Sequence, residues 1–298
     1  MKNILIIGCG LIGSSLVRII SHKKIAKKIF VYEKSKSNII KIKKLKLRCK
    51  VINDLKKIVP DSDLIIFCTP LSEYKNLILK INKYLLPKTI ITDVGSTKEK
   101  SNEVIKKKLK KGISWTPSHP IAGSEVSGPE SGSKDLFLNK WCILIKEKNT
   151  NLKHLAILNK FWKKIGSKIV IMNSKKHDVI FSMTSHLPHL IAYNLVKTAT
   201  DFEKQLKHEL IRFSAGGLRD FSRIASSNEI MWRDIFFNNQ SNILKVIDLF
   251  INNLRLFKKD IKLKNDKVII KKLINSKKVR KKIIKLKQDI NKPDFGRN

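Results

Sequence analysis

Eight polar residues in this sequence have side chains that enzymes use for proton transfer and anion binding, and they fall into four short segments. They are Ser96 in DVGSTK, His119 in SHPIAGSE, Ser185, His186 and His189 in MTSHLPH, and Arg219, Asp220 and Arg223 in LRDFSRIA. Histidine exchanges a proton near neutral pH, and arginine pairs with carboxylates. The four segments are therefore the candidate catalytic and substrate-binding segments.

Each of these residues also has an ordinary structural alternative. Ser96 could be the N-cap of a helix, and Arg223 could pair with Asp220 three residues earlier. A single loop histidine such as His119 is more often capped or solvated than catalytic. Trp232, at helical spacing in IMWRDI, could belong to the core rather than to a substrate wall. Taken one at a time, the residues leave both interpretations open.

Two of the segments follow predicted strands. Ser96 comes after the apolar run Thr89–Val94, and His119 ends the extended segment Ser114–His119, because a residue before proline favours an extended backbone. In open α/β sheets, ligands bind beyond the carboxyl ends of the strands. Both side chains are therefore predicted to lie at the edge of the sheet where a substrate would bind.

The N-terminus has the pattern of a dinucleotide-binding turn. The apolar run Asn3–Ile7 leads into GCGLIG, and the amphipathic segment Ser14–Ile20 follows. In this pattern Gly8 permits the tight turn, Gly10 leaves space for a pyrophosphate and Gly13 lets the helix pack on the strand. The helix N-terminus then offers free N–H groups to the phosphates.

The second predicted strand, Lys28–Tyr32, ends in Glu33, about twenty residues beyond the glycines. A Rossmann fold places there the carboxylate that binds the ribose hydroxyls, and this carboxylate would repel a 2′-phosphate. NAD is therefore favoured over NADP. The following Lys34, Ser35 and Lys36 could hold a phosphate, so NADP stays open as the alternative.

Strand and helix patterns alternate through residue 172 and then give way to helix. Further strands are predicted at 62–68, 141–145 and 168–172, with helices at 39–47, 72–85, 101–110 and 152–164. This predicts an α/β Rossmann-type N-terminal domain with a mostly parallel sheet at 1–173, followed by an all-α domain at 174–298. Ser174 is the expected N-cap, and Gly216-Gly217 and Asn265-Asp266 are the expected breaks.

The first helix of the second domain carries the third candidate segment. Ser185 and His189, four residues apart, share a helix face, although Pro188 must kink that helix. Further on, the stretch Lys258–Lys287 alternates lysine clusters with apolar residues at helical spacing.

Composition limits the class of protein. The 298 residues suit two domains, and 42% are hydrophobic. The net charge of +39 raises nucleic-acid binding as an alternative, but the lysines are spread evenly and no basic-aromatic module stands out, so we interpret them as solvated. The four scattered cysteines lack metal-ligand spacing and fit a reducing cytoplasm. The first apolar run is too short to span a membrane and is not expected to be a signal peptide.

Seven motifs in this order and spacing resemble the prephenate/arogenate dehydrogenase family: GCGLIG, FCTP, DVGSTK, HPIAGSE, SHLPH, DFSRIA and IMWRDI. The resemblance runs from residue 3 to about residue 240. HPIAGSE and SHLPH separate this family from the 6-phosphogluconate and 3-hydroxyacid dehydrogenases, which share only the glycine motif and the general layout. The lysine-rich tail resembles the family only as helix.

The resemblance implies oxidative decarboxylation of prephenate to 4-hydroxyphenylpyruvate in tyrosine biosynthesis. Hydride leaves C4 for NAD⁺, the C4 hydroxyl loses its proton and carbon dioxide leaves as the ring becomes aromatic. His119 then corresponds to the catalytic proton acceptor, Ser96 to the serine that hydrogen-bonds the same hydroxyl, and Arg223 to the arginine that holds a substrate carboxylate.

The same resemblance implies further contacts. The substrate contacts are His189, Ser185, Ser124, Glu125, Gly216 and Trp232. The cofactor contacts are Gly8, Gly10, Leu11, Ile12, Gly13, Glu33, Thr69 and Pro70. A homodimer through the helical domain is also implied, and no metal is. His189 suits the charge of a keto acid, which favours prephenate. Arogenate dehydrogenase and another NAD-dependent hydroxyacid dehydrogenase are the alternatives.

Overall fold

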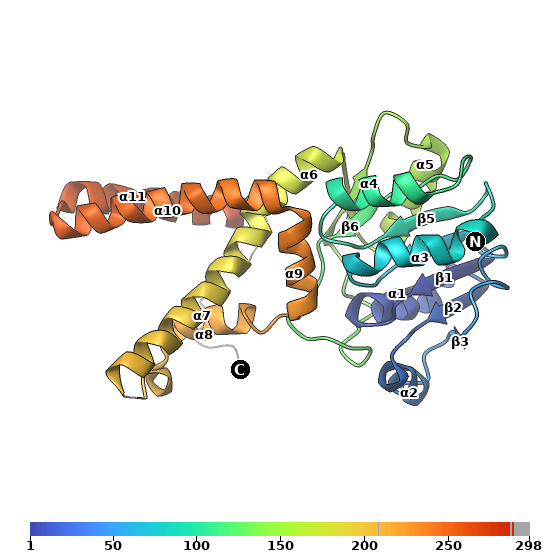
Figure 1. The fold of residues 1–298 in the computed structure, drawn as a ribbon, viewed down its shortest axis with the longest axis horizontal. Helices are drawn as coiled ribbons and strands as arrows, with labels where there is room; N and C mark the ends of the chain where they lie inside the picture. The colour runs from blue at the N-terminus through green and yellow to red at the C-terminus, as the bar shows by residue number, and fades with distance from the viewer. Residues whose placement is uncertain (208, 287, 289–298) are drawn as a thin grey trace.

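The computed structural model describes residues 1–207, 209–286 and 288, and it divides into an α/β part and a helical part (Figure 1). The main sheet has five parallel strands in the order β3-β2-β1-β4-β5. These strands are β1 (Asn3–Ile7), β2 (Lys28–Tyr32), β3 (Lys50–Ile52), β4 (Leu64–Phe67) and β5 (Ile90–Asp93). The order places β1 at the centre, between β2 and β4, and the carboxyl ends of all five parallel strands lie at the same end of the sheet.

A second sheet of three strands continues from the β5 edge. It contains β6 (Ser118–Pro120), β7 (Trp141–Ile145) and β8 (Lys168–Met172). β6 is antiparallel to β7, and β7 is parallel to β8. A bridge between Ile91 and Trp115 joins the segment before β6 to β5. The prediction of a mostly parallel α/β domain is therefore confirmed.

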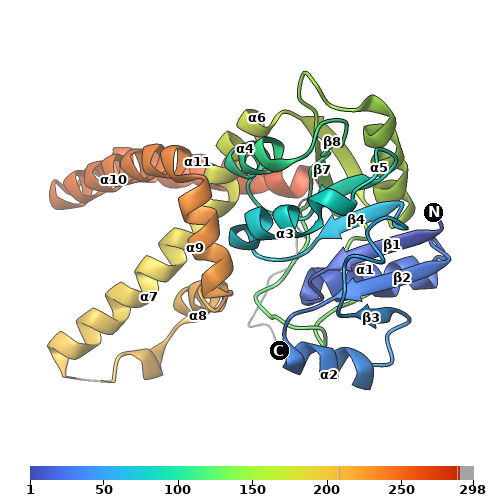
Figure 2. The ribbon, with the colours of Figure 1, turned by 45° about the vertical axis from the view of Figure 1, so that its right-hand side comes forward.

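Helices flank the two sheets (Figure 2). They are α1 (Leu11–His22), α2 (Lys36–Lys44), α3 (Tyr74–Ile81), α4 (Glu99–Lys108) and α5 (Leu152–Lys164), which lies beside β7 and β8 of the second sheet. Ile4 and Ile6 pack with α1 and α5 in one buried cluster, and Leu5 and Ile7 pack with α3 in another. Since successive strand side chains point to opposite faces, β1 is buried on both.

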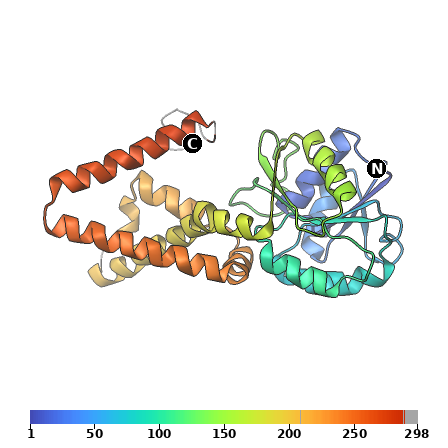
Figure 3. The same ribbon diagram turned by 90° about the horizontal axis from the view of Figure 1, so that it is seen from above.

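The helical part projects away from the sheets (Figures 1 and 3). It contains α6 (Ser174–Phe181), a π-helical turn (Ser182–His186), α7 (Leu187–Leu206), a 3₁₀ turn (Ile211–Phe213), α8 (Gly216–Ile224), α9 (Glu229–Asn238), α10 (Gln240–Lys262) and α11 (Asp266–Lys285). Within the described ranges no strand follows β8, which confirms the all-helical prediction. His208, Lys287 and residues 289–298 of the predicted domain lie outside them. No helix described in the structure is long and apolar enough to cross a membrane.

One local prediction about the helical part was wrong. Asn173, not Ser174, is the N-cap of α6, because its side chain accepts a hydrogen bond from the backbone of Lys176. Pro188 lies in the first turn of α7, directly after a π-helical turn that interrupts the regular α-helix. Gly216-Gly217 lies at a helix boundary, since α8 begins at Gly216 with Ala215 as its N-cap.

The strand β3 was also not predicted. It has only three residues, Lys50–Ile52, at the edge of the sheet, and an alternation of side chains is not readable over so short a run.

Candidate active site

A cleft of about 920 Å³ lies between the carboxyl ends of the main-sheet strands and the helical part. Its walls come from the first two residues of α1, the segments after β4, β5 and β6, and helices α7, α8 and α9. It brings together twelve of the predicted site residues: Leu11, Ile12, Thr69, Pro70, Ser96, His119, Ser124, Glu125, Ser185, His189, Arg223 and Trp232. These residues span more than two hundred positions of sequence, so the fold alone assembles the site.

The glycine turn has the shape that a pyrophosphate requires. Gly8 has φ +90°, and a Cβ there would lie 2.6 Å from the carbonyl oxygen of Cys68. A Cβ on Gly13 would lie 2.1 Å from the carbonyl oxygen of Gly8, so no other residue fits either position. A Cβ on Gly10 would meet nothing within 4 Å. Because Gly10 begins α1 without a side-chain cap, the space beside it faces free backbone N–H groups.

Glu33 lies at the end of β2 beside this turn. Its carboxylate accepts hydrogen bonds from the backbone N–H of Cys9 at 2.8 Å and of Ser35 at 2.9 Å. Lys34, a candidate for holding a 2′-phosphate, is instead paired with Glu73. The residues present therefore fit a dinucleotide with an unmodified ribose better than one with a 2′-phosphate.

His119 lies on β6 and lines the cleft. Its Nδ1 is 2.8 Å from Nε2 of His177, which leaves its own Nε2 for the cleft. Burial lowers the pKa of His119 well below the usual value, and His177, Lys98 and His186 lower it further in their protonated forms. A neutral histidine with a free ring nitrogen can accept a proton.

Ser96 lies between β5 and α4, and a buried ion pair beside it fixes this loop. Lys98 is fully buried, and its Nζ lies 2.6 Å from Oδ2 of Asp93 and 2.6 Å from the carbonyl oxygen of Ser118. Tyr74 donates a further hydrogen bond to Asp93 at 2.9 Å. Burial lowers the pKa of Lys98, and the Asp93 carboxylate opposes that effect. These contacts of Lys98 connect the end of β5 to the start of β6. They thereby connect the loop that carries Ser96 to the strand that carries His119.

Arg223 enters the cleft from α8 with part of its guanidinium exposed. Its Nη1 lies 3.4 Å from Oε1 of Glu125, and its Nη2 lies 3.8 Å from Oδ1 of Asp220. The i, i+3 pair that the sequence left open is therefore present, together with a contact across the cleft. An arginine at this position can bind a carboxylate of a bound molecule.

His189 and Trp232 form one wall of the cleft. Their rings stack at 3.9 Å with an interplanar angle of 23°, and Trp232 is buried. His189 Nδ1 lies 3.0 Å from the carbonyl oxygen of Ser185, and burial lowers the pKa of His189. Trp232 is therefore both a core residue and a wall of the site.

Not every candidate reaches the cleft. Gly216 does not line it, because seven residues separate Gly216 from Arg223 on α8, about 10 Å along the helix axis. Arg219 does not line the cleft either, and His186 is fully buried behind it with Asn239 Nδ2 at 3.1 Å from its Nδ1. In the described part of the chain, no group of three or more His, Cys, Asp or Glu side chains could hold a metal.

Four polar residues that support the site were not predicted from the sequence. Asp93 and Lys98 lie within the DVGSTK motif, and His177 and Asp178 lie soon after the end of β8. Two features of the sequence could have indicated them: Asp93 is an ionisable residue in an apolar strand, and His177 and Asp178 follow the end of a strand. Neither feature identifies the partner residue, because the partner lies on a different element of the fold.

Comparisons with known proteins agree with this architecture. The model of the prephenate dehydrogenase nucleotide-binding domain matches residues 16–171, and that of the prephenate dehydrogenase dimerization domain matches residues 173–276. The chain is 34% identical to the cyclohexadienyl dehydrogenase of Zymomonas mobilis over 85% of this chain and 86% of that protein. It is 31% identical to the prephenate dehydrogenase of Bacillus subtilis over 84% of this chain and 68% of that protein.

A solved structure extends the comparison to three dimensions. Prephenate dehydrogenase from Aquifex aeolicus, in complex with hydroxyphenyl propionate and NAD⁺, superimposes with a TM-score of 0.88 at 31% identity. The match covers 95% of this chain and 98% of that one. The chain therefore belongs to the prephenate dehydrogenase family and is an NAD-dependent oxidoreductase.

Proposed function

We propose that this enzyme oxidises prephenate with NAD⁺, releases carbon dioxide and forms 4-hydroxyphenylpyruvate, the step that leads to tyrosine. The observation that carries this proposal is the position of His119. A neutral histidine with a free Nε2 shares one cleft with an arginine and with the end of the glycine turn. The relatives named as prephenate dehydrogenases support the same substrate.

The reacting end of the substrate lies between His119 and Ser96 in this proposal. His119 accepts the proton of the C4 hydroxyl at Nε2, and Ser96 hydrogen-bonds the same oxygen. NAD⁺ supplies the hydride acceptor, and its pyrophosphate binds at the glycine turn with the first N–H groups of α1. The cofactor contacts from the loop after β4 are Thr69 and Pro70.

The other end of the substrate is held from the helical part. Arg223 binds a carboxylate, and Trp232 forms an apolar wall beside it. Ser124, Glu125, Ser185 and His189 supply the remaining polar contacts. The cleft therefore lies between a dinucleotide-binding domain at 1–173 and a substrate and dimerisation domain at 174–298.

Arogenate is a second candidate substrate, and His189 provides the observation that favours it. If Nδ1–H of the neutral ring donates to the carbonyl of Ser185, Nε2 is an acceptor. An acceptor suits the ammonium group of arogenate, whereas the keto acid of prephenate has no donor at that position. A neutral His189 therefore no longer favours prephenate by its charge.

The proposal predicts the outcome of one assay with two substrates and two cofactors. NAD⁺ reduction should be faster with prephenate than with arogenate at equal concentration. With NADP⁺, kcat/KM should be at least about tenfold lower, because Glu33 repels the 2′-phosphate. Equal efficiency with both cofactors would assign a phosphate to Lys34 or Lys36. Turnover of 3-hydroxy acids or 6-phosphogluconate instead would contradict the substrate assignment.

A homodimer through the helical part is the second component of the proposal. The projecting helices carry exposed large apolar side chains, among them Leu195, Phe202, Leu249, Leu256 and Ile274. Apolar surface of this kind is usually covered by a partner. Light scattering at micromolar protein should give twice the mass of one chain. A monomer with full activity would contradict the dimer.

The proposed compartment is the cytoplasm. Cys9, Cys49, Cys68 and Cys142 are all free thiols, as expected in a reducing environment.

A further inference from the structure

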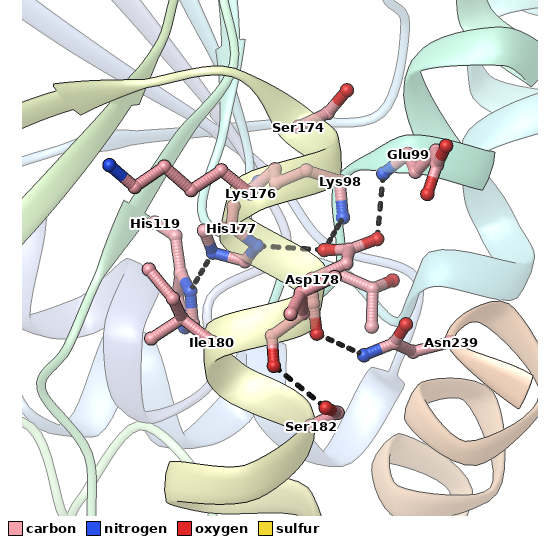
Figure 4. Close-up of polar contacts among 12 residues, drawn as sticks. Lys98, Glu99, His119, Ser174, Lys176, His177, Asp178, Ile180, Ser182 and Asn239 are labelled. Atoms are coloured by element: carbon pink, nitrogen blue, oxygen red, sulfur yellow. Dashed lines mark hydrogen bonds and ion pairs between the residues drawn. The ribbon is translucent and has the colours of Figure 1, made fainter. Parts of the chain in front are cut away.

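His119, His177 and Asp178 form a continuous chain of hydrogen bonds behind the cleft, which Figure 4 shows. Nδ1 of His119 lies 2.8 Å from Nε2 of His177, and Nδ1 of His177 lies 2.7 Å from Oδ1 of Asp178. His177 and Asp178 lie on α6 and are almost completely buried. Neither lines the cleft, so they can reach a substrate only through His119.

Asp178 determines the direction of these hydrogen bonds. Its Oδ1 also accepts from the backbone N–H of Lys98 at 2.8 Å, and its Oδ2 accepts from the backbone N–H of Glu99 at 2.9 Å. Both donors lie at the N-terminus of α4, where a carboxylate is favoured. Because a carboxylate only accepts, Nδ1 of His177 must carry a proton and donate it to Asp178.

The protonation of His177 then fixes that of His119. Burial lowers the pKa of His177, although Asp178 opposes that effect, and a neutral imidazole carries one ring proton. With that proton on Nδ1, Nε2 of His177 is an acceptor, so Nδ1 of His119 must be the donor. His119, neutral as well, then has no proton on Nε2, the nitrogen left for the cleft.

We propose that His177 is a positioning residue that holds His119 in the tautomer able to accept the substrate's proton. The hydrogen bond from His177 to Asp178 also places a negative charge where it stabilises the imidazolium that His119 becomes during the reaction. This inference rests on the proposed role of His119, and it adds the two residues that set the state of that base.

The alternative is that this cluster only stabilises the fold. Asp178 caps α4, and Asn239 Nδ2 donates to the carbonyl oxygen of Asp178 at 2.8 Å, so the cluster also joins α4, α6 and the segment between α9 and α10. A purely structural role predicts a lower melting temperature with kcat unchanged in the folded enzyme. A positioning role predicts a lower kcat in enzyme that still binds both substrates.

His177→Phe and His177→Gln separate these two roles. Phenylalanine keeps a planar aromatic ring without an acceptor, whereas glutamine keeps an acceptor for Nδ1–H of His119. In the NAD⁺–prephenate assay, His177→Phe should lower kcat about 10- to 100-fold, less than the loss of the base itself. The KM for each substrate should change less than about threefold, and His177→Gln should recover at least about fivefold of the lost kcat.

A matched control is available outside the cleft. His154 on α5 is as buried as His119, and its Nδ1 lies 2.6 Å from Oγ of Ser114. It does not line the cleft. His154→Phe makes the same chemical change at a buried histidine outside the cleft. If the loss of a buried histidine does not by itself lower activity, the kcat of His154→Phe should stay within about twofold of that of the unsubstituted enzyme.

The tautomer can be observed directly by ¹⁵N NMR of histidine-labelled enzyme, with the His119 signals identified by their loss in His119→Asn. The unsubstituted enzyme should show a protonated Nδ1 and an unprotonated Nε2 at His119, and His177→Phe should show a mixture. Unchanged kcat in folded His177→Phe, or a protonated Nε2 in the unsubstituted enzyme, would overturn the inference. If His119→Asn itself kept full activity, the proposed role of His119 would be the part that fails.

Discussion

Replacement of His119 by asparagine is expected to lower kcat about 10²–10⁴-fold, the usual contribution of a general base. Asparagine retains a hydrogen-bonding side chain of similar size but accepts no proton at neutral pH. In its proposed role His119 acts on the reacting hydroxyl rather than on the carboxylates, so the KM for prephenate should change little. Steady-state kinetics with NAD⁺ and prephenate measure both quantities.

The control for this variant is binding. His119→Asn should bind NAD⁺ with unchanged affinity in a calorimetric titration, because the glycine turn and Glu33 are built from other strands. A variant with normal kcat and a raised KM would instead make His119 a substrate-binding residue.

Replacement of Arg223 by alanine is expected to raise the KM for prephenate about 10- to 100-fold. A charge-assisted hydrogen bond to a carboxylate contributes about 1.5–3 kcal/mol, which corresponds to that loss of affinity. Because the contact is already present when the substrate binds, kcat should fall much less than in His119→Asn. Initial rates over a wide range of prephenate concentrations distinguish the two parameters.

Arg219→Ala is the matched control on the same helix. It removes the same charge about one turn earlier on α8, from a side chain that does not line the cleft. The KM of Arg219→Ala for prephenate should stay within about twofold of that of the unsubstituted enzyme. Equal increases in both variants would mean that overall positive charge, rather than a specific contact of Arg223, attracts the substrate.

The parts of the fold that the sequence predicted are those with strong local signals. Residues 3–20 combine an apolar strand, the glycine turn GCGLIG and a helix start, so their role can be predicted from this one segment. The helical part was readable because the pattern after residue 173 has helical spacing throughout. The edge strand β3 was not, because three residues carry too little periodicity.

The buried polar residues that support the site could not be predicted from local sequence patterns. Lys98 looks like one of many surface lysines in a chain with a net charge of +39, yet it is fully buried against Asp93. The pairing of His177 with His119 depends on the packing of α6 against β6, 58 residues apart. Such contacts are properties of the tertiary structure, and no spacing in the sequence specifies them.

The pH dependence of kcat/KM tests whether a neutral, buried His119 accepts the proton. Burial lowers the pKa of His119 well below its usual value, and the neighbouring ionisable groups lower it further in their protonated forms. Because the active form is the unprotonated one, activity should be constant above that pKa and fall only as the pH drops through it. We therefore expect a flat profile through about pH 6.5, with an acid limb at lower pH that is absent in His119→Asn. An acid limb centred at or above pH 6.5, or one that persists in His119→Asn, would mean that His119 is not the group that accepts the proton.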